Sequence, residues 1–499
     1  MTNRRKIKED NYKIEFVDRI IDPVHGFIDL TQVEKEIVGL PIFKRMQSLK
    51  QLSLTNWVFP GAEHTRYMHS LGVMYIADLM AINLKKLDGH PRFNDGERQL
   101  LRLAGLLHDI GHYPLSHVTE YVYSDNLLEE NDTLLAINKN VKKKIDSLLD
   151  DTKMPEYMKS RSSKPMHHET MGKKVIENDT TIKQIIKKYC PFIDIEDICD
   201  IIVGNIERNP KISTMVQLIH SELDADGIDY VMRDASFSGT SYGSFELGLL
   251  LRNLVVTNYN GFEIVGIKPK GISIVDQYLI SKYFSYTQVI FNKHVAIFDT
   301  MVEIFSNHLI KLSKSTYPSS IDLNKYIENH MTNDEFLKFT DRSFWTQLDN
   351  LQNNDLKGIV PEYVVRIFEK LSHYQEFNIT KNGEIIITSD NKEDIQNILK
   401  KSNLYSSLLN ENEDKLFLYH VRGFTTEIPE KNYRELINQL ELKDVNEENF
   451  KSKNVLRLQE GIAIIENGKA PKLLVDDSRS IMSHLYNTKT YILRQYDVE

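Results

Sequence analysis

A histidine and an aspartate are adjacent at His108-Asp109, inside the segment Leu-Leu-His-Asp-Ile-Gly-His-Tyr-Pro-Leu-Ser-His that covers residues 106–117. An imidazole and a carboxylate on neighbouring residues can both reach one divalent metal ion. In a chain with 16 histidines such a pair also occurs by chance, so it needs further ligands elsewhere. A metal site built on this pair would constrain the fold, because it requires distant segments to converge on one point.

Two further segments offer such ligands. Upstream, His69 precedes Ser-Leu-Gly in the segment 64–72, and downstream Asp226 stands in the segment Leu-Asp-Ala-Asp-Gly-Ile-Asp-Tyr of residues 223–230. Together with the dipeptide they supply two imidazoles and two carboxylates, which leaves coordination positions for water and a phosphate oxygen. Any one of these histidines alone is better explained as a hydrogen-bonded structural residue. The combination of four favours a metal site, whose ion could be manganese, iron, magnesium, cobalt, nickel or zinc.

Composition limits the class of protein. The chain has 499 residues, of which 41% are hydrophobic and 27% charged, as in a globular protein with more than one domain. Its formal net charge of −9 argues against a nucleic-acid partner, because phosphate contacts need an excess of Lys and Arg. No apolar run is long enough to span a membrane and no signal-type segment is visible, so no membrane contact is expected. The two cysteines cannot form a disulfide framework, so we expect a cytoplasmic protein.

The pattern of apolar residues predicts a mostly α fold. Residues 1–310 show helical spacing, most clearly in 37–54, 70–87, 100–107, the stretch from 214 and the long stretch 272–312. Residues 255–267 instead predict a hairpin with Asn260-Gly261 as its turn. Beyond residue 310 short strand patterns alternate with charged helical stretches. We therefore expect a helical core over 1–310 and a smaller α+β lobe over 311–499.

One segment of the core differs in composition. Residues 123–165 contain Lys-Lys-Lys, Asp-Asp and Ser-Arg-Ser-Ser runs. Such charged runs are typical of a solvated surface segment. We expect it to be a peripheral, mobile insert that carries no chemistry.

The arrangement H…HD…D resembles the signature of the HD metal-dependent phosphohydrolases. The surrounding motifs are similar to those of the deoxynucleoside triphosphate (dNTP) triphosphohydrolases, and they cover most of residues 15–310. They are Asp22-Pro-Val-His-Gly26, Lys50-Gln51-Leu52, Phe59-Pro-Gly-Ala62, His64-Thr-Arg66-Tyr-Met-His69-Ser-Leu-Gly72, His108–His117, His168-Glu169 and Asp226-Gly-Ile-Asp-Tyr230-Val-Met-Arg-Asp234. The resemblance implies an HD-domain helical core. The short stretch before these motifs leads us to expect the bacterial type, without an added sterile-alpha-motif domain.

The resemblance also implies the chemistry. It is the hydrolysis of a dNTP to deoxynucleoside and inorganic tripolyphosphate, by attack of metal-activated water on the α-phosphorus, with His69, His108, Asp109 and Asp226 as metal ligands. The leaving 5′-oxygen needs a proton, and a nearby histidine can supply one. The resemblance implies that His112 and His168 form the catalytic cluster with Glu120, and that His117 contacts phosphate or acts as an acid. Each of these could instead be a polar structural residue.

The same resemblance identifies residues for the substrate. Arg66 matches an arginine that clamps phosphate, and Lys282 matches a basic residue on the helix after the hairpin, although an exposed lysine would explain Lys282 equally well. Tyr230 and Asp234 match residues that hold phosphate and the sugar 3′-hydroxyl. Gln51 and Leu52 match the pair that packs against the sugar, where a tight fit would exclude a 2′-hydroxyl.

This sequence departs from the pattern at a regulatory site. A vertebrate member binds a guanine nucleotide there to assemble its tetramer, through residues that here are Asp18, Ile21, Gly39 and Gln47. Asp18 replaces a lysine and would repel a triphosphate, which argues against the same activator. Lys293 and His294 could serve a different nucleotide effector, but a basic helix face explains them as well. The resemblance implies a homo-oligomer, a dimer or a tetramer.

Gly227 stands where that vertebrate member has a lysine beside the metal-binding aspartate, so one phosphate contact is missing. Two alternatives to the dNTP reading stay open. One is another HD phosphohydrolase, acting on nucleoside monophosphates, cyclic nucleotides or nucleic-acid ends. The other is a regulatory nucleotide- or nucleic-acid-binding protein whose HD site is vestigial.

Overall fold

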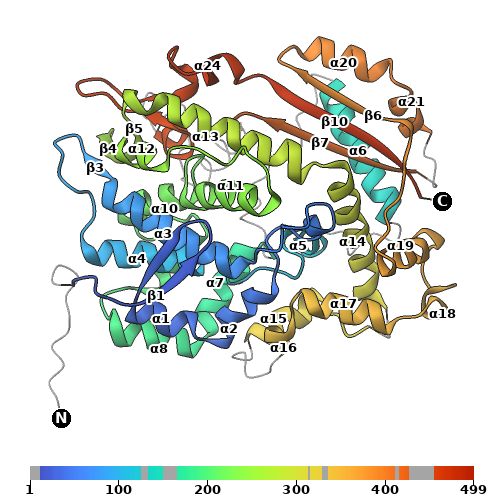
Figure 1. Cartoon of the computed structure of the whole chain (residues 1–499), viewed down its shortest axis with the longest axis horizontal. Coiled ribbons are helices and arrows are strands. Elements are labelled where there is room, and N and C mark those ends of the chain that lie inside the picture. Colours follow the sequence, from blue (N-terminus) through green and yellow to red (C-terminus); the bar gives the residue numbers. More distant parts are fainter. Residues whose placement is uncertain are drawn as a thin grey trace, which may run out of the picture.

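The computed structural model describes residues 12–124, 133–149, 166–312, 315–328, 335–410, 415–425 and 455–498. Most of these residues are helical, and the strands form three small sheets (Figure 1). The expected fold class, a mostly α chain with a smaller sheet-containing part, is confirmed. No described helix combines the length and the apolar character that a membrane crossing requires.

Three helices form the centre of the core: α3 (Arg66–Asn83), α4 (Asp95–Leu107) and α11 (Ala225–Ser238). Helix α4 begins at Asn94, whose side chain accepts from the backbone N–H of Glu97 in a capping box. Deeper in the same helix the buried guanidinium of Arg102 donates to Glu34, 2.7 Å away, and to Asp78, 2.8 Å away. These bonds hold α4 against α1 (Gln32–Val38) and α3.

Further helices surround this centre. They are α2 (Pro41–Lys44), α5 (His117–Ser124), α6 (Thr133–Leu149), α7 (His168–Asn178), α8 (Thr180–Tyr189), α9 (Ile195–Ile202), α10 (Ser213–His220), α12 (Leu247–Arg252), α13 (Ile272–Phe284) and α14 (Lys293–Lys311). The helices after residue 311 are α15 (Ser320–Glu328), α16 (Glu335–Lys338), α17 (Asp341–Asn350), α18 (Asn353–Leu356), α19 (Glu362–Ser372), α20 (Lys392–Lys400), α21 (Asn403–Leu409) and α24 (Met482–Leu485).

The expected hairpin at residues 255–267 is present as β4 (Leu254–Tyr259) and β5 (Phe262–Ile267). Asn260 and Gly261 form its turn with φ values of 53° and 86°, as a two-residue turn of this kind requires. Three short strands, β3 (Lys85–Lys86), β8 (Ala463–Ile464) and β9 (Lys472–Leu473), extend this sheet in the order β3-β4-β5-β8-β9. A second hairpin, β1 (Phe16–Asp22) and β2 (Gly26–Thr31), lies near the N-terminus.

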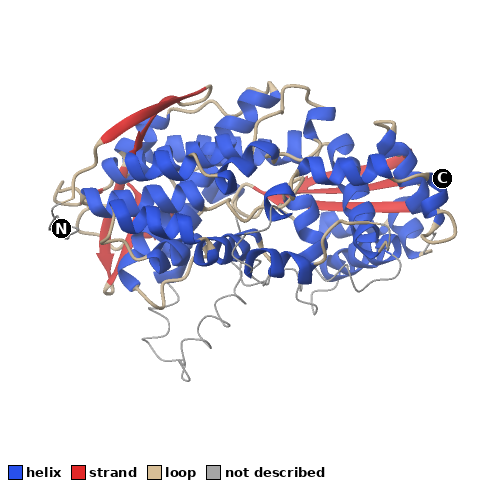
Figure 2. Cartoon of the chain, turned by 90° about the horizontal axis from the view of Figure 1, so that it is seen from below, coloured by secondary structure: helices blue, strands red, loops and turns tan. Residues whose placement is uncertain are grey.

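The third sheet lies at the end of the molecule that carries the C-terminus (Figure 2). Its central strand is β10 (Lys489–Asp497), which pairs antiparallel with β6 (Ile379–Ser389) on one side and β7 (Lys415–Gly423) on the other. One face packs against α6, α20 and α21 in an apolar cluster that includes Ile145, Leu399, Phe417 and Leu493. The division of the chain into two domains at residue 310 stays a prediction. Strands β8 and β9 come from the later part of the chain, yet they join the sheet of β4 and β5.

Three helix predictions need correction. Residues 37–54 do not form one helix: α2 is followed by a 3-10 turn, η2 (Arg45–Ser48), and by Lys50, which pairs with Thr65. The stretch from 214 is two helices, α10 and α11, separated at 221–224. The stretch 272–312 is interrupted by a π-helical turn, η9 (Ser285–Ile290). In each case the apolar spacing continues across the break, so periodicity alone does not locate it.

The expected mobile insert at 123–165 also needs correction in its middle. Residues 133–149 form α6, which buries Val141 and Ile145 against the sheet of β7 and β10. The lysines of this segment lie on a helix whose other face is apolar. Residues 125–132 and 150–165 lie outside the described part of the chain.

Asp341 connects the later part of the chain by hydrogen bonds to the segment after the His-Asp pair. It lies in the first turn of α17 and is 7% exposed. Its carboxylate accepts from the backbone N–H of Leu115 at 2.7 Å and from that of Lys50 at 2.8 Å. Leu115 has a φ of 53°, a left-handed conformation that such external bonds help to hold. Burial raises the pKa of Asp341 to about 6.

We predict that Asp341→Asn lowers stability by about 1–2 kcal/mol near pH 5, because an amide cannot accept from both N–H groups. The folded state of the wild type binds the Asp341 proton more tightly than the unfolded state does, so the wild type loses stability as pH rises through about 6. The deficit of the variant should therefore narrow by roughly 1 kcal/mol between about pH 5 and pH 8. Urea denaturation at both pH values measures this, and a deficit that grows with pH would contradict it.

Candidate functional site

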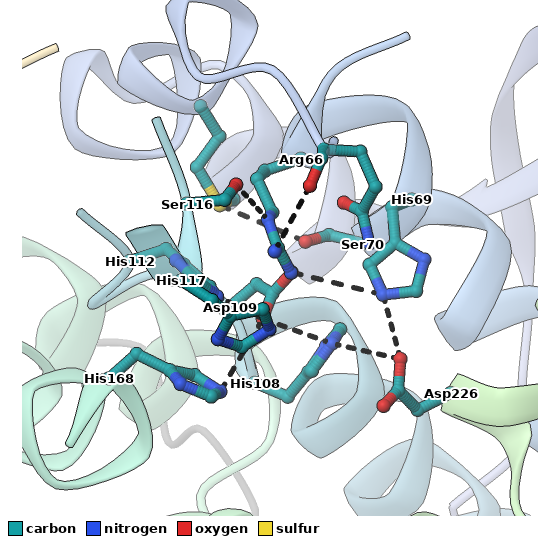
Figure 3. Close-up of polar contacts among 12 residues, drawn as sticks. Arg66, His69, Ser70, His108, Asp109, His112, Ser116, His117, His168 and Asp226 are labelled. Carbon is teal, nitrogen blue, oxygen red and sulfur yellow. Dashed lines mark hydrogen bonds and ion pairs between the residues drawn. The ribbon is translucent and has the colours of Figure 1, made fainter. Parts of the chain in front are cut away.

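The four residues expected to bind metal converge on one point (Figure 3). His69 comes from α3, His108 ends α4 and Asp109 follows it, and Asp226 lies in the first turn of α11. His69 Nε2 is 2.8 Å from Asp226 Oδ1 and 3.8 Å from Asp109 Oδ2. His108 Nε2 is 3.4 Å from Asp109 Oδ1 and 3.9 Å from Asp226 Oδ1. These side chains therefore present two imidazole nitrogens and two carboxylates to a shared volume.

Both imidazoles are oriented through their other nitrogen. His69 Nδ1 is 2.7 Å from Asp229 Oδ2, and His108 Nδ1 is 2.8 Å from the carbonyl oxygen of Gly105. Nε2 of His108 is buried and has no hydrogen-bond partner among the described residues. This is the arrangement of metal-binding histidines, in which a second bond fixes the tautomer that offers a lone pair to the ion. The donor set fits a divalent cation.

The electrostatics of the site also favour a cation. Burial alone would lower the pKa of His69, yet the carboxylates of Asp226 and Asp229 raise it to about 10. The surrounding negative charge thus attracts a positive charge to this point. A bound divalent ion would take the place of that proton.

Asp229 has an orienting role that the sequence analysis did not assign. Its carboxylate binds His69 and also His25 Nε2, at 2.5 Å, and Arg233, whose Nε donates at 2.8 Å. Asp229 stands three residues after Asp226, so on a helix it reaches the same neighbourhood one turn later. That spacing within Asp226-Gly-Ile-Asp229 is the signal that could have identified it.

Gly72 explains why the His69 motif ends in glycine. A Cβ at this position would lie 1.9 Å from Asp229 Oδ1 and 2.4 Å from Arg233 Nη2. Helix α3 therefore needs a residue without a side chain where Asp229 and Arg233 of α11 approach it. The close approach lets Asp229 reach His69.

Gly111 likewise allows α7 to approach closely. A Cβ on Gly111 would lie 2.1 Å from the backbone nitrogen of Gly172 and 2.4 Å from the carbonyl oxygen of His168. The turn after the His-Asp pair consequently packs directly on the backbone of α7. This contact brings His168 beside the metal ligands, although it stands 59 positions after Asp109 in the sequence.

A second group of side chains adjoins the metal ligands: His112, His117, Glu120 and His168, whose ligand atoms lie within 4.8 Å of one another. Glu120 Oε2 is 2.8 Å from His117 Nδ1, and Glu120 Oε1 is 3.1 Å from His168 Nδ1. The rings of His112 and His168 stack with centroids 4.3 Å apart. Nε2 of His112 and of His168 lie 3.9 Å and 4.0 Å from Asp109 Oδ1. The structure thus brings together all four residues expected to act in catalysis.

The two stacked histidines differ in charge. Burial alone would raise the pKa of Glu120, but the charge of His168 and the hydrogen bonds from His117 and His168 hold it well below its usual range. Burial likewise opposes protonation of His168, yet the Glu120 carboxylate raises its pKa to about 9. Burial holds the pKa of His112 well below 6.5. Near neutral pH the cluster therefore contains a protonated His168 beside a neutral His112.

Arg66 binds one metal ligand and the residue that precedes His117. Its Nη1 donates to Asp109 Oδ2 at 2.8 Å and its Nε to the Ser116 hydroxyl at 2.9 Å (Figure 3). It is 4% exposed, and the turn containing Gln51 lies beside it, since Nη2 is 3.4 Å from the Gln51 carbonyl oxygen. Gln51 is buried with its side-chain Oε1 unpartnered among the described residues, and Leu52 is partly buried.

Asp234 and Tyr230 lie further along α11. Asp234 Oδ1 is 2.8 Å from His64 Nε2, so His64 orients Asp234 and does not belong to the metal group. Tyr230 is partly buried, one turn after Asp226. Burial raises the pKa of Tyr230 well above its usual value, and the nearby phenol of Tyr286 acts in the same direction. Tyr230 therefore offers a neutral hydroxyl.

Lys282 is not the exposed lysine that the alternative explanation required. It is 8% exposed on α13, with Nζ 3.4 Å from Glu222 Oε1. A Cβ on Gly227 would lie 3.7 Å from this Nζ and 2.4 Å from the Tyr278 hydroxyl. The ammonium of Lys282 thus lies beside Gly227, the position at which the vertebrate member has a lysine.

Comparison with known proteins agrees with this site. Residues 66–211 match the HD domain family, and that range includes the His-Asp pair, His69 and His168. The uncharacterized protein YwfO of Bacillus subtilis is 32% identical over 272 residues, which cover 54% of this chain and 51% of YwfO. The match thus spans about half the length of that relative.

Two further proteins extend the comparison. The human deoxynucleoside triphosphate triphosphohydrolase SAMHD1 is 43% identical over 101 residues, which are 20% of this chain and 16% of SAMHD1. A structure described as a phosphohydrolase from Bacteroides thetaiotaomicron has a TM-score of 0.57 at 20% identity and covers 96% of this chain and 99% of its own. At that identity the likeness shows the fold. The match to the HD domain, together with the identity to SAMHD1, supports a hydrolase with a metal-binding His/Asp site.

We predict that His108→Ala or Asp109→Ala weakens the binding of divalent metal by more than about 100-fold, because each removes a direct ligand. Elemental analysis of purified protein after dialysis measures the bound metal. His90→Ala, at an exposed histidine outside the site, is the matched control and should retain the metal content of the wild type. Equal metal content in all three variants would contradict the assignment of this site.

Proposed function

We propose that this chain, in which residues 66–211 match the HD domain family, hydrolyses dNTPs to deoxynucleoside and inorganic tripolyphosphate. The observation that carries the proposal is the adjacency of the metal-binding group and the second group (His112, His117, Glu120 and His168), which meet at Asp109, where Arg66 also binds. A phosphate ester held there would meet a metal ion, a protonated imidazole and a guanidinium together. The 43% identity with a named dNTP triphosphohydrolase over 101 residues supports this choice of substrate.

His69, His108, Asp109 and Asp226 would hold the divalent metal, which when bound supplies a Lewis acid and lowers the pKa of water. The protonated His168 would donate its proton to the 5′-oxygen as that oxygen leaves the α-phosphorus. Glu120 keeps His168 charged and fixed through its bond to Nδ1, which leaves Nε2 to face the substrate. His117, more exposed than His168 and bound to the same carboxylate, would contact the phosphates from the rim.

Other residues would hold the rest of the nucleotide. Arg66 and Lys282 are the cations proposed to bind phosphate oxygens, with Tyr230 as a neutral hydroxyl donor. Asp234, fixed by His64, would accept from the sugar 3′-hydroxyl. Gln51 and Leu52 would pack against the sugar, where a 2′-hydroxyl finds no space to hydrate. We also propose a homo-oligomer, and a nucleotide effector other than the guanine nucleotide of the vertebrate pattern.

We predict that the metal-loaded protein releases tripolyphosphate from at least one dNTP, and hydrolyses the matching ribonucleotide at least about 10-fold more slowly. Incubation with each dNTP, singly and in mixtures, followed by chromatography of the products, measures both. Activity that appears only in mixtures would indicate an effector. Orthophosphate or pyrophosphate as the initial product would assign the chain to another class of HD phosphohydrolase.

We predict that Glu120→Gln lowers kcat by about 100- to 10,000-fold, the usual range for loss of general acid catalysis. The pKa of His168, about 9 beside the carboxylate, falls when the carboxylate is lost, so the residual activity should decline at a lower pH than in the wild type. A pH profile of kcat for both proteins measures the shift. An unchanged alkaline limb would show that His168 is not the acid.

A further inference from the structure

One face of the C-terminal sheet covers the helices beside the proposed substrate site. Alternate residues of β7 and of the segment that follows it contact aromatic rings on α13, η9 and the turn after η9. The pairs are Phe424 with Tyr283 at 4.1 Å between ring centroids, Arg422 with Tyr286 at 3.8 Å from the guanidinium carbon to the ring centroid, and His420 with Phe291 at 4.6 Å between centroids. The period of two that defines a strand thus directs Arg422 toward η9.

Neighbouring contacts confirm where Arg422 lies. Arg422 pairs with Thr490 of β10 in the sheet, and the Thr490 hydroxyl is 2.6 Å from that of Tyr283. Tyr283 follows Lys282 directly on α13. In Figure 1, β7 and β10 run alongside the end of α13. The strand that bears Arg422 is therefore fixed against the helix that bears Lys282.

Arg422 is partly buried, and its guanidinium differs in its partners from those of the fully buried arginines. Arg66, Arg102 and Arg233 donate to carboxylates, and Arg45 donates to backbone carbonyl oxygens. In Arg422, Nε and Nη2 are inaccessible to solvent and have no hydrogen-bond partner among the described residues. Leaving such donors unpaired is costly, more so for a charged group. The cost indicates a site built for an acceptor that the described residues do not supply.

The stack on Tyr286 defines what that acceptor can be. A guanidinium whose flat face lies on a ring keeps its N–H groups at the edge, where they can bind two oxygens of one phosphate or carboxylate. The charge of Arg422 lowers the pKa of Tyr230 and of Lys282, against larger effects that raise both, so its guanidinium is near both groups. Tyr230 in turn lies one helical turn from Asp226. The Arg422 guanidinium therefore lies near the part of α11 that carries a metal ligand.

We propose that Arg422 binds the terminal phosphoryl group of the polyphosphate chain, as a clamp supplied by the C-terminal sheet. This inference rests on the proposed function, because it takes the substrate to be a nucleoside triphosphate. Arg66 and the metal ligands hold the phosphate at the reacting end, whereas Arg422 and Lys282 receive the far end beyond Tyr230. A triphosphate carries about four negative charges, and Arg66 binds only the phosphate at the reacting end. The positive charges of Arg422 and Lys282 would balance the negative charge of the terminal phosphate.

The test uses inorganic tripolyphosphate and orthophosphate as probes of the full-length, metal-loaded protein by calorimetric titration, with metal content measured after each run. Arg422→Gln should weaken tripolyphosphate binding by about 10- to 100-fold, the usual effect of losing a charge-assisted hydrogen-bonding group. Orthophosphate, which is too short to extend from the metal ligands to Arg422, should bind unchanged. Arg422→Lys keeps the positive charge but loses the planar pair of N–H donors, so its affinity for tripolyphosphate should lie between those of the wild type and Arg422→Gln.

Arg342→Gln, at an exposed arginine of α17, is the matched control for the change of charge and should bind both probes as the wild type does. Equal affinity of Arg422→Gln and the wild type for tripolyphosphate would overturn the inference. So would an equal loss of both probes, because that indicates a general distortion of the site. If no dNTP is hydrolysed but tripolyphosphate binding still depends on Arg422, the proposed function fails and the clamp stands. If a dNTP is hydrolysed but tripolyphosphate binding does not depend on Arg422, the clamp fails and the proposed function stands.

Discussion

The buried carboxylate of Asp229 is the interaction on which the site most depends. It binds His69 of α3, His25 of the β1–β2 turn and Arg233 of its own helix, while Arg233 also donates to Asp22 at the end of β1. Removing one partner from such a group leaves a charge without compensation in a region that excludes water, at a cost of about 3–5 kcal/mol. The network thus joins three separate segments and orients one metal ligand at the same time.

Most of the site could be predicted from the sequence, because the chemistry that identifies it is local. His108-Asp109, His69 and Asp226 each stand in short motifs, and the helices that carry them have regular apolar spacing. Gly72 and Gly111 were part of those motifs, but their reason is visible only in three dimensions, where a backbone and a pair of charged side chains occupy the space of a Cβ. Asp229 could have been found from its spacing to Asp226, whereas nothing local distinguishes Arg422 from any other strand arginine.

Helix ends and long-range contacts were harder to predict, since they depend on partners far along the chain. Residues 37–54 have helical periodicity, yet Lys50 pairs with Thr65 and its N–H is bound by Asp341, almost 300 residues later. The charged segment around α6 looked unable to pack, because the sheet that covers its apolar face is formed by strands beyond residue 378. Composition describes a segment alone, whereas burial depends on what another segment brings to it.

The π-helical turn η9 joins α13 to α14 at the point where the C-terminal sheet packs. A π turn accommodates one more residue than an α turn does. Its C-cap is Phe291, and Asn292, whose ψ of 136° is extended, caps α14. Each residue of an α-helix advances its side chains by about 100° around the axis. Deleting Ser285 would therefore turn the rings of Tyr286 and Phe291 away from Arg422 and His420, which they now contact. The length of this short segment sets which aromatic rings α13 presents to the C-terminal sheet.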